Sequence, residues 1–354
     1  MSRFISERFA QLSSYVPGEQ PQDKSYIKLN TNESPYPPAP QVVEVLNIKE
    51  INDLRLYSDP ECKKLRNTLA DCYKVSSENI MVGNGSDEIL SFAFMAFCDK
   101  NIGVSYPDIS YGFYSVFAEL YGLSKREIPL CDDFSICAEN YFNLGTTVVV
   151  ANPNAPTGIC LSLADIEAIV KSNSENVVVI DEAYIDFGGE SSIPLTARYD
   201  NLLVVQTFSK SRSLAGARLG YAVGNKELIA DLEKLRYSTN PYNVNRLTLL
   251  AGVAALSNGA YYDKNDSVII QTRDYTGEKL TELGFELTNS KANFLFARHP
   301  KLKGKELYQG LRERGILVRH FDKPKTSDYV RITVGTKDQM DALLNSLKEM
   351  LTNA

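Results

Sequence analysis

The chain has 354 residues, of which 44% are hydrophobic, and it carries 38 basic against 44 acidic side chains, a formal net charge of -6. This length and composition indicate a globular protein with a substantial core, in which a large domain is accompanied by a smaller one. The slightly acidic charge excludes a bulk attraction to nucleic acids or anionic membranes, so any anionic ligand needs a local site.

The N-terminal segment lacks the sustained apolar run and the cleavage site of a secretory signal, and no segment is long and apolar enough to span a bilayer. We therefore expect a cytoplasmic protein. The six cysteines show no CxxC spacing, so reduced thiols are the expectation, although a disulfide stays open. His299 and His320 stand in no HxxxH or HExxH pattern, so no metal site is predicted and a Ser-His-Asp triad loses most of its support.

Residues 1–28 are predicted to form an irregular or helical N-terminal arm. The next segment, LNTNESPYPPAP (29–40), is rich in Asn and Pro, which excludes a regular helix or a central strand. We expect this segment to border a ligand cleft. Further on, Ser58 or Asp59 is expected to cap a helix, and Tyr57 just before it reads as a packing residue.

A short predicted strand at 79–82 is followed by GNGSDE and then by an apolar helix that ends at Cys98. Gly83 and Gly85 allow a sharp turn, and Ser86 is expected to cap the helix, whose first N–H groups then face the space above the strand. The turn is a candidate phosphate site. A simple strand-to-helix turn is the alternative, because the pattern lacks the third glycine of a dinucleotide fingerprint and no Walker lysine follows.

Further buried strands are predicted at 102–105, 146–151, 177–180 and 202–205. Apolar strands that alternate with helices indicate an α/β protein, whose mostly parallel sheet is covered on both faces. Ligands of such sheets bind at the carboxyl ends of the strands. Those ends hold side chains that one cleft could collect, namely Gly85, Ser86, Tyr111, Asn154, Asp181, Tyr184, Ser209 and Lys210.

Beyond the last of these strands the predicted helices become longer, and short strands then alternate with helices up to the C-terminus. This pattern predicts a smaller α+β domain. We place the domains at 1–28 for the arm, which belongs to the small domain, at 29–258 for the large domain, and at 259–354 for the small C-terminal domain.

The segment FSKSRSLAGARLGYAVG (208–224) holds Lys210 between two serines, with Arg218 eight residues further on. From these residues alone, a Schiff-base lysine beside an anion site and a pair of ordinary surface charges are equally supported. That balance changes when the other strand ends are considered. Asp181 lies at a strand end, Tyr184 follows it by three residues, and the chain also offers a separate aromatic side chain and an anion site. Together they match pyridoxal phosphate, which needs an amine, a carboxylate for its ring nitrogen, a flat ring partner and a phosphate site.

Eight motifs follow one another over nearly the whole chain: LNTNESP, YSDPECKKLR, GNGSDE, SYGFY, NPNAPTG, VVIDEAYIDF, FSKSRSLAGARLGYAVG and VRITVGT. In these motifs the chain resembles the fold-type I pyridoxal-phosphate-dependent aminotransferases, and within them the histidinol-phosphate aminotransferase family of histidine biosynthesis. The resemblance implies a large domain with a mostly parallel central sheet sandwiched by helices, a smaller α+β domain, and a homodimer.

The resemblance also implies roles for the motif residues. Lys210 would hold the cofactor as an internal aldimine and then move a proton between the substrate α-carbon and the cofactor. Asp181 would pair with the pyridinium nitrogen, Tyr184 would hydrogen-bond the phenolic oxygen, and Tyr111 would stack on the ring. The phosphate would be bound by Gly85, Ser86, Asp87, Ser209 and Arg218, and by Tyr57 of the neighbouring subunit.

For the substrate, the resemblance implies that Arg331 in VRITVGT clamps an anionic group in a bidentate manner. Arg319 is a candidate second positive charge for a substrate phosphate, and Tyr15 is a candidate lid contact. For these last two residues, a surface arginine and a packed tyrosine are the alternatives.

One motif departs from the family pattern. The family commonly has NPNNPTG, with an asparagine that hydrogen-bonds the ring oxygen, where this chain has Ala155 in NPNAPTG. Either Asn154 substitutes for it, or Tyr184 makes the contact with less help. The loss of one hydrogen bond costs about 1 kcal/mol, which tunes the cofactor without abolishing its binding.

The implied reaction is a ping-pong transfer of the amino group of histidinol phosphate to 2-oxoglutarate, which gives imidazole-acetol phosphate and glutamate. A threonine-phosphate decarboxylase and an aromatic amino acid aminotransferase are the alternatives on the same fold. A non-catalytic binding protein is disfavoured, because Lys210 is retained and no basic N-terminal extension is present. Small molecules are the expected partners, without nucleic acid or membrane.

Overall fold

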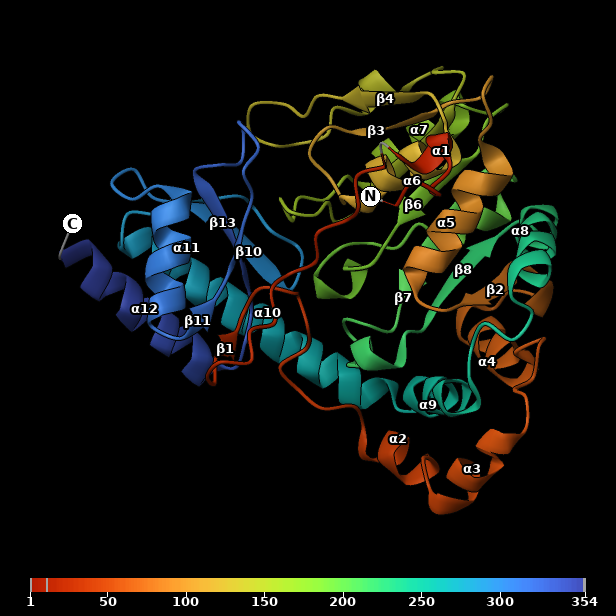
Figure 1. The fold of residues 1–354 in the computed structure, drawn as a ribbon, viewed down its shortest axis with the longest axis horizontal. Coiled ribbons are helices and arrows are strands. Elements are labelled where there is room, and N and C mark those ends of the chain that lie inside the picture. The colour runs from red at the N-terminus through yellow and green to blue at the C-terminus, as the bar shows by residue number, and fades with distance from the viewer. Residues whose placement is uncertain (1, 11, 353–354) are drawn as a thin grey trace.

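The computed structural model describes residues 2–10 and 12–352 (Figure 1). Its main sheet has the strand order β2-β8-β7-β6-β5-β3-β4. Neighbouring strands run parallel, except that β8 is antiparallel to both β2 and β7. The sheet is thus mostly parallel, as predicted. The bounds are β2 Ile80–Gly83, β3 Val104–Pro107, β4 Lys125–Ile128, β5 Thr147–Ala151, β6 Val178–Asp181, β7 Leu202–Thr207 and β8 Gly220–Gly224.

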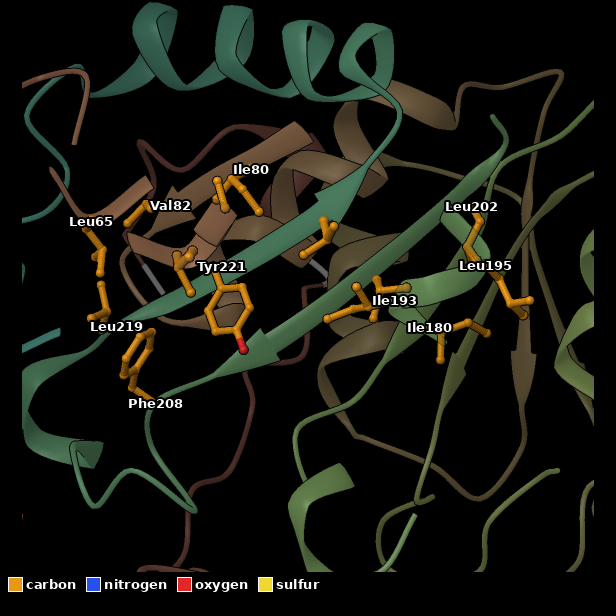
Figure 2. Packing of buried hydrophobic residues seen from close by; sticks show 14 of the residues in the cluster. Leu65, Ile80, Val82, Ile180, Ile193, Leu195, Leu202, Phe208, Leu219 and Tyr221 are labelled. Atoms are coloured by element: carbon orange, nitrogen blue, oxygen red, sulfur yellow. The ribbon is translucent and has the colours of Figure 1, made fainter. Parts of the chain in front are cut away.

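Both faces of the sheet are covered by helices, which explains why its central strands are apolar throughout. In β7, Leu202 faces the core shown in Figure 2, and Leu203 faces a second core on the other side. Each such side chain contributes about 1.5–3 kcal/mol when it is buried. The first face is covered by α4 Lys63–Tyr73, α7 Leu163–Ser172 and α9 Arg246–Leu256, and the second by α5 Ser86–Phe97, α6 Phe113–Tyr121 and α8 Lys226–Thr239.

A second sheet, in the order β12-β13-β10-β9, lies in the C-terminal part and has a core of its own. Figure 1 shows the long helix α10 (Gly259–Glu282) between the two parts. This part confirms the predicted smaller α+β unit, while the residue boundaries of the domains stay a prediction. The elements are β9 Glu286–Leu287, β10 Phe294–Arg298, β12 Arg319–His320, β13 Tyr329–Thr333, α11 Gly304–Glu313 and α12 Lys337–Thr352.

The N-terminal segment connects the two parts. After α1 (Glu7–Ala10), strand β1 (Ile27–Lys28) pairs in parallel with β11 (Ile316–Leu317) of the C-terminal part. The chain then returns to the main sheet through α2 (Pro40–Val45) and α3 (Ile48–Asn52), which project at the bottom of Figure 1. Residues 29–33 therefore lie where the two parts meet. Short 3₁₀ helices complete the fold: η1 Asp53–Arg55, η2 Ser77–Asn79, η3 Ala138–Tyr141, η4 Ile185–Phe187, η5 Ile193–Ala197 and η6 Ala215–Ala217.

Two helix starts differ from the prediction. Helix α4 begins at Lys63, because the Asp59 carboxylate accepts the N–H groups of Glu61 and Lys63 and forms a turn ahead of the helix. In α5, Gly85 is the N-cap and Ser86 is already helical. Among the described residues, no helix has the length and apolar character needed to cross a membrane.

Candidate active site

A cavity of about 710 Å³ opens at the carboxyl ends of β5, β6 and β7. Residues from the N-terminal segment, the main sheet and the C-terminal part line it together. One cleft therefore collects the side chains predicted at the strand ends, with the exception of Gly85 and Asn154. The predicted site residues in its lining are Tyr15, Ser86, Asp87, Tyr111, Asp181, Tyr184, Ser209, Lys210, Arg218, Arg319 and Arg331.

Asp181 ends β6 and is almost fully buried. Its Oδ2 accepts a hydrogen bond of 2.8 Å from the Tyr114 hydroxyl, whereas its Oδ1 makes no hydrogen bond of good geometry among the described residues, although the nearby backbone N–H of Ala183 acts to lower the pKa of the carboxyl. Burial raises the pKa of this carboxyl from 3.8 to about 6, and the charge of Asp87 acts in the same direction. Burial also raises the pKa of Tyr114 well above 10, so its hydroxyl remains a neutral donor. A buried carboxylate with one free oxygen suits a cationic N–H donor.

Lys210 follows β7 and reaches the cavity beside Tyr184. Its Nζ donates a hydrogen bond of 3.3 Å to the Thr31 carbonyl and lies 5.6 Å from the centroid of the Tyr184 ring. That ring packs edge-on against Phe294, and its hydroxyl oxygen accepts a hydrogen bond of 2.9 Å from Asn32 Nδ2. A backbone carbonyl satisfies only one of the three lysine N–H groups, so the amine remains available to a ligand.

Arg218 lies against the N-terminus of α5. Gly85 has a φ of +80°, and a Cβ there would lie 2.8 Å from Arg218 Nη2, so only glycine allows the guanidinium this close approach. Arg218 Nη2 is 3.0 Å from Asp87 Oδ2, and Asp87 Oδ1 accepts a hydrogen bond of 2.7 Å from Tyr111. The first N–H groups of α5 together with Arg218 favour an anion such as phosphate, and Ser209 lines the same cavity.

Aromatic side chains line the cavity near Asp181. Tyr111 lies edge-on to Tyr114, with the ring centroids 5.7 Å apart. Tyr15 lies 6.2 Å from Tyr111 and stacks on Phe113 at 4.2 Å. Burial raises the pKa of both Tyr15 and Tyr111, so both phenols are neutral near pH 7. These rings provide flat apolar surfaces for a planar ligand.

Arg319 and Arg331 stand directly opposite each other on the antiparallel strands β12 and β13. The Arg331 guanidinium lies over the rings of Phe294 and Phe321 and donates to the Asn30 carbonyl at 3.1 Å, but its Nε has no partner among the described residues. Burial lowers the pKa of Arg331, and the like charge of Arg319 acts in the same direction. Like charges in direct opposition are destabilising, which indicates an anion site.

Arg319 also holds the N-terminal arm against the cavity. Its Nη1 donates to the Pro17 carbonyl and its Nη2 to the Val16 carbonyl, both at 2.9 Å. These bonds fix the backbone next to Tyr15, whose side chain lines the cavity. The arrangement is compatible with the predicted lid contact.

Three predicted residues do not line the cavity. Gly85 contributes through the approach of Arg218 described above. Tyr57 is 79% exposed and stacks on Tyr242, with the ring centroids 4.4 Å apart, away from the cavity of its own chain. The buried Asn154 amide donates to the Ile109 carbonyl and accepts from the Ser110 hydroxyl, so the geometry does not support its assignment as a replacement cofactor contact.

Sequence reasoning missed two residues of the site, Tyr114 and Asn32. Tyr114 follows Tyr111 by three positions at the predicted start of a helix, and this short spacing could have indicated that the two rings lie close together. Asn32 lies in the segment that was expected only to border a cleft. Its partner, Tyr184, is 152 residues away, so no local pattern indicates their contact.

The residues present fit pyridoxal phosphate. The unpartnered Asp181 Oδ1 is the observation that carries this fit, since the ring nitrogen of the cofactor is the donor it lacks. Lys210 offers the amine, and Arg218 with the start of α5 offers the phosphate site. Fold and site together define a pyridoxal-phosphate-dependent enzyme of the fold-type I class. The family model for aminotransferases of class I and II matches residues 24–347, and the chain belongs to this family.

Curated proteins that are similar to this chain over their full length narrow the family assignment to one group of aminotransferases. The histidinol-phosphate aminotransferase of Brachyspira hyodysenteriae is 48% identical over the full length of both chains, and that of a Marinomonas species is 49% identical over 99% of this chain and 100% of its own. Within the class I and II aminotransferases, the chain belongs to the histidinol-phosphate aminotransferase group, which confirms the resemblance of the eight motifs. The Sinorhizobium meliloti histidinol-phosphate aminotransferase, solved with pyridoxal-5'-phosphate, shares the fold with a TM-score of 0.88 at 24% identity, over 99% of this chain and 100% of its own.

Proposed function

We propose that the enzyme transfers the amino group of histidinol phosphate to 2-oxoglutarate in a ping-pong reaction, giving imidazole-acetol phosphate and glutamate. The names of its full-length relatives support histidinol phosphate as the amino donor. A threonine-phosphate decarboxylase and an aromatic aminotransferase are the rival activities on the same fold.

The observation that carries the proposal is the opposed pair Arg319 and Arg331. Both guanidinium groups face the cavity that also contains Lys210, and they come from directly paired positions of β12 and β13. Two cations side by side repel each other, so a ligand with two negative charges stabilises the pair more than a ligand with one. A phosphate monoester fits this requirement, and an aromatic amino acid without phosphate does not.

When bound, pyridoxal phosphate supplies an electron sink that stabilises negative charge at the substrate α-carbon. Lys210 would hold the cofactor through its amine and, once released, its Nζ would move the proton at the α-carbon. Asp181 Oδ1 would accept the ring N–H and keep that nitrogen protonated. The rings near Tyr111 and the arm near Tyr15 would exclude water from the reacting atoms.

A spectral titration of the purified holoenzyme tests the amino donor. Histidinol phosphate is expected to change the absorbance of the bound cofactor stoichiometrically, and 2-oxoglutarate should then restore it with release of one glutamate. The loss of two charged hydrogen bonds, one from each arginine and each contributing about 1.5–3 kcal/mol, means that histidinol without phosphate should need at least about 100-fold higher concentration. Release of carbon dioxide from threonine phosphate, or an equal response to phenylalanine, would refute the proposed substrate.

We further propose that the enzyme is a homodimer in which Tyr57 reaches the cofactor phosphate of the neighbouring subunit. Exposed apolar side chains on α2, α3, η1 and the two residues after η1 support a second copy as the occupant. These side chains are each at least 45% exposed, namely Val43, Ile48, Ile51, Leu54, Leu56 and Tyr57.

Mixed dimers test the reach of Tyr57. Tyr57→Phe alone is expected to weaken cofactor binding about tenfold, the effect of one hydrogen bond to a charged group. A dimer of one Tyr57→Phe subunit and one Lys210→Ala subunit should regain one site with wild-type affinity, because the intact Lys210 then faces an intact Tyr57. Sedimentation gives the oligomeric state, and mixed dimers without regained affinity would show that Tyr57 serves its own subunit.

A cytoplasmic location is part of the proposal. All six cysteines are free thiols in the structure, and burial raises the pKa of Cys62, Cys98 and Cys160 to about 11. Free and unreactive thiols are typical of proteins in a reducing compartment.

A further inference from the structure

A chain of hydrogen bonds connects Thr333 on β13 to Tyr184 through Asn32. The Asn32 backbone N–H donates to Thr333 Oγ1 at 2.9 Å, and the Thr333 hydroxyl donates to Asn32 Oδ1 at 3.0 Å. On its other side, Asn32 Nδ2 donates to the Tyr184 hydroxyl oxygen at 2.9 Å. Asn32 is 1% exposed and lines the cavity, but the proposed chemistry does not yet use it.

The direction of these bonds follows from the number of hydrogens available. The Thr333 hydroxyl has one hydrogen, and because its oxygen already accepts the Asn32 N–H, that hydrogen goes to Asn32 Oδ1. The amide is thereby oriented with its NH₂ group towards Tyr184. The Tyr184 oxygen therefore accepts from Asn32, and its own hydrogen is left to point elsewhere.

The backbone of Asn32 is fixed as firmly as its side chain. It has a φ of +54°, in the left-handed region that asparagine adopts more readily than most residues. Its carbonyl accepts a hydrogen bond of 3.1 Å from the buried Asn293 amide. Since both ends are held, Asn32 cannot turn away when a ligand enters the cavity.

We propose that Asn32 is a positioning residue. Its NH₂ group donates a hydrogen bond to the Tyr184 oxygen and cannot accept one in return. The Tyr184 O–H is thereby directed into the cavity as a donor to the cofactor's phenolic oxygen. This inference rests on the proposed role of Tyr184 in the aminotransferase. Ala155 packs in the same cluster as Tyr184 and offers no polar atom. The amide that assists Tyr184 therefore comes from residue 32, on a different segment from the NPNAPTG turn.

The pH titration of the visible absorbance of the holoenzyme tests the proposal without any substrate. A hydrogen-bond donor to the cofactor's phenolic oxygen stabilises the anionic form of that oxygen. Loss of the donor therefore raises the pH at the midpoint of this titration. Tyr184→Phe is expected to raise the midpoint by about one pH unit. Asn32→Ala should cause part of that rise, because the released hydroxyl is no longer directed. The rise of the midpoint in Asn32→Asp should exceed that in Asn32→Ala, because a carboxylate accepts a hydrogen bond from the Tyr184 hydroxyl and turns the O–H away from the cofactor.

The double variant separates positioning from a general structural effect. If Asn32 acts through Tyr184, Asn32→Ala should cause no further rise of the midpoint in the Tyr184→Phe background. An equal rise in both backgrounds, or no rise in either, would overturn the proposal. Asn32→Ala carries the test even if Asn32→Asp fails to fold. The midpoint is measured without an amino donor, so failure of the substrate proposal would leave this result intact.

Discussion

Lys210→Ala is expected to lower kcat for amino transfer by at least about 10³-fold, because the variant loses both the amine that holds the cofactor and the group that moves the proton. The fold should persist, since within residues 2–10 and 12–352 the Lys210 side chain makes a single hydrogen bond, of 3.3 Å, to the Thr31 carbonyl. Steady-state assay with saturating cofactor measures the effect. Lys348→Ala, at an exposed position on α12, is the matched control and should retain the wild-type rate.

A second variant separates the charge of Lys210 from its proton transfer. Arginine keeps the positive charge, but its guanidinium stays protonated in proteins and cannot act as a base near neutral pH. Lys210→Arg should therefore be about as inactive as Lys210→Ala. If either variant turned over at the rate of the wild-type enzyme, the role of this lysine would have to be abandoned.

Asp181→Asn is expected to lower kcat by about 10²–10³-fold, the range found when one preorganised electrostatic interaction is removed. The amide has nearly the same shape and can still accept the 2.8 Å hydrogen bond from Tyr114, so the substitution removes mainly the charge. Without that charge the ring nitrogen of the cofactor is no longer held in its protonated form. Asp186→Asn, a partly exposed carboxylate five residues further on, is the control. A wild-type rate in Asp181→Asn would contradict the assignment.

Although it lowers kcat, Asp181→Asn should raise the free energy of unfolding of the cofactor-free protein at neutral pH. Burial raises the pKa of Asp181 from 3.8 to about 6 on folding, which corresponds to a penalty of about 3 kcal/mol on the folded state at neutral pH. Well below pH 4 both states are protonated, and the carboxyl causes no difference in stability. Between about pH 4 and pH 6 the unfolded chain ionises while the folded carboxyl stays protonated, so the penalty on the folded state grows over this range and is complete above pH 6. Urea unfolding should show Asp181→Asn to be more stable than wild type at pH 7.5, with the difference vanishing towards pH 4.

The central strands could be predicted because their sequences are apolar on both faces, and the strand-end rule then placed Asp181 and Lys210 at one edge. In the main sheet, the strands missed were β4, whose residues Lys125, Arg126 and Glu127 are exposed, and β8, whose glycines obscure its pattern. Neither has the continuous apolar run that identified the others. Edge position and glycine content, rather than distance along the chain, explain these omissions.

The substrate side of the site was accessible only through the resemblance. Nothing local in the sequence indicates that Arg319 and Arg331 face each other, because their pairing depends on the register of β12 and β13. Likewise, the hydrogen bonds of Asn32 are set by how β13 and the loop after β6 approach each other. Such contacts between distant segments follow from tertiary packing, which no periodicity records.

The pairing of β1 with β11 also constrains how the site forms on the ribosome. Ile27 pairs with Ile316, and the Leu29 carbonyl accepts a backbone hydrogen bond from Thr333, so a segment that precedes the main sheet binds strands that are made after the whole of that sheet. Contacts of such sequence separation form late, because a long loop must close before they become favourable. The main sheet and its covering helices end with α9 at Leu256, but the segment that holds Thr31 and Asn32 is fixed beside Lys210 and Tyr184 only after β11 and β13 have been made. Tight uptake of the cofactor therefore marks the end of folding, and a nascent chain that stops short of β13 should lack it.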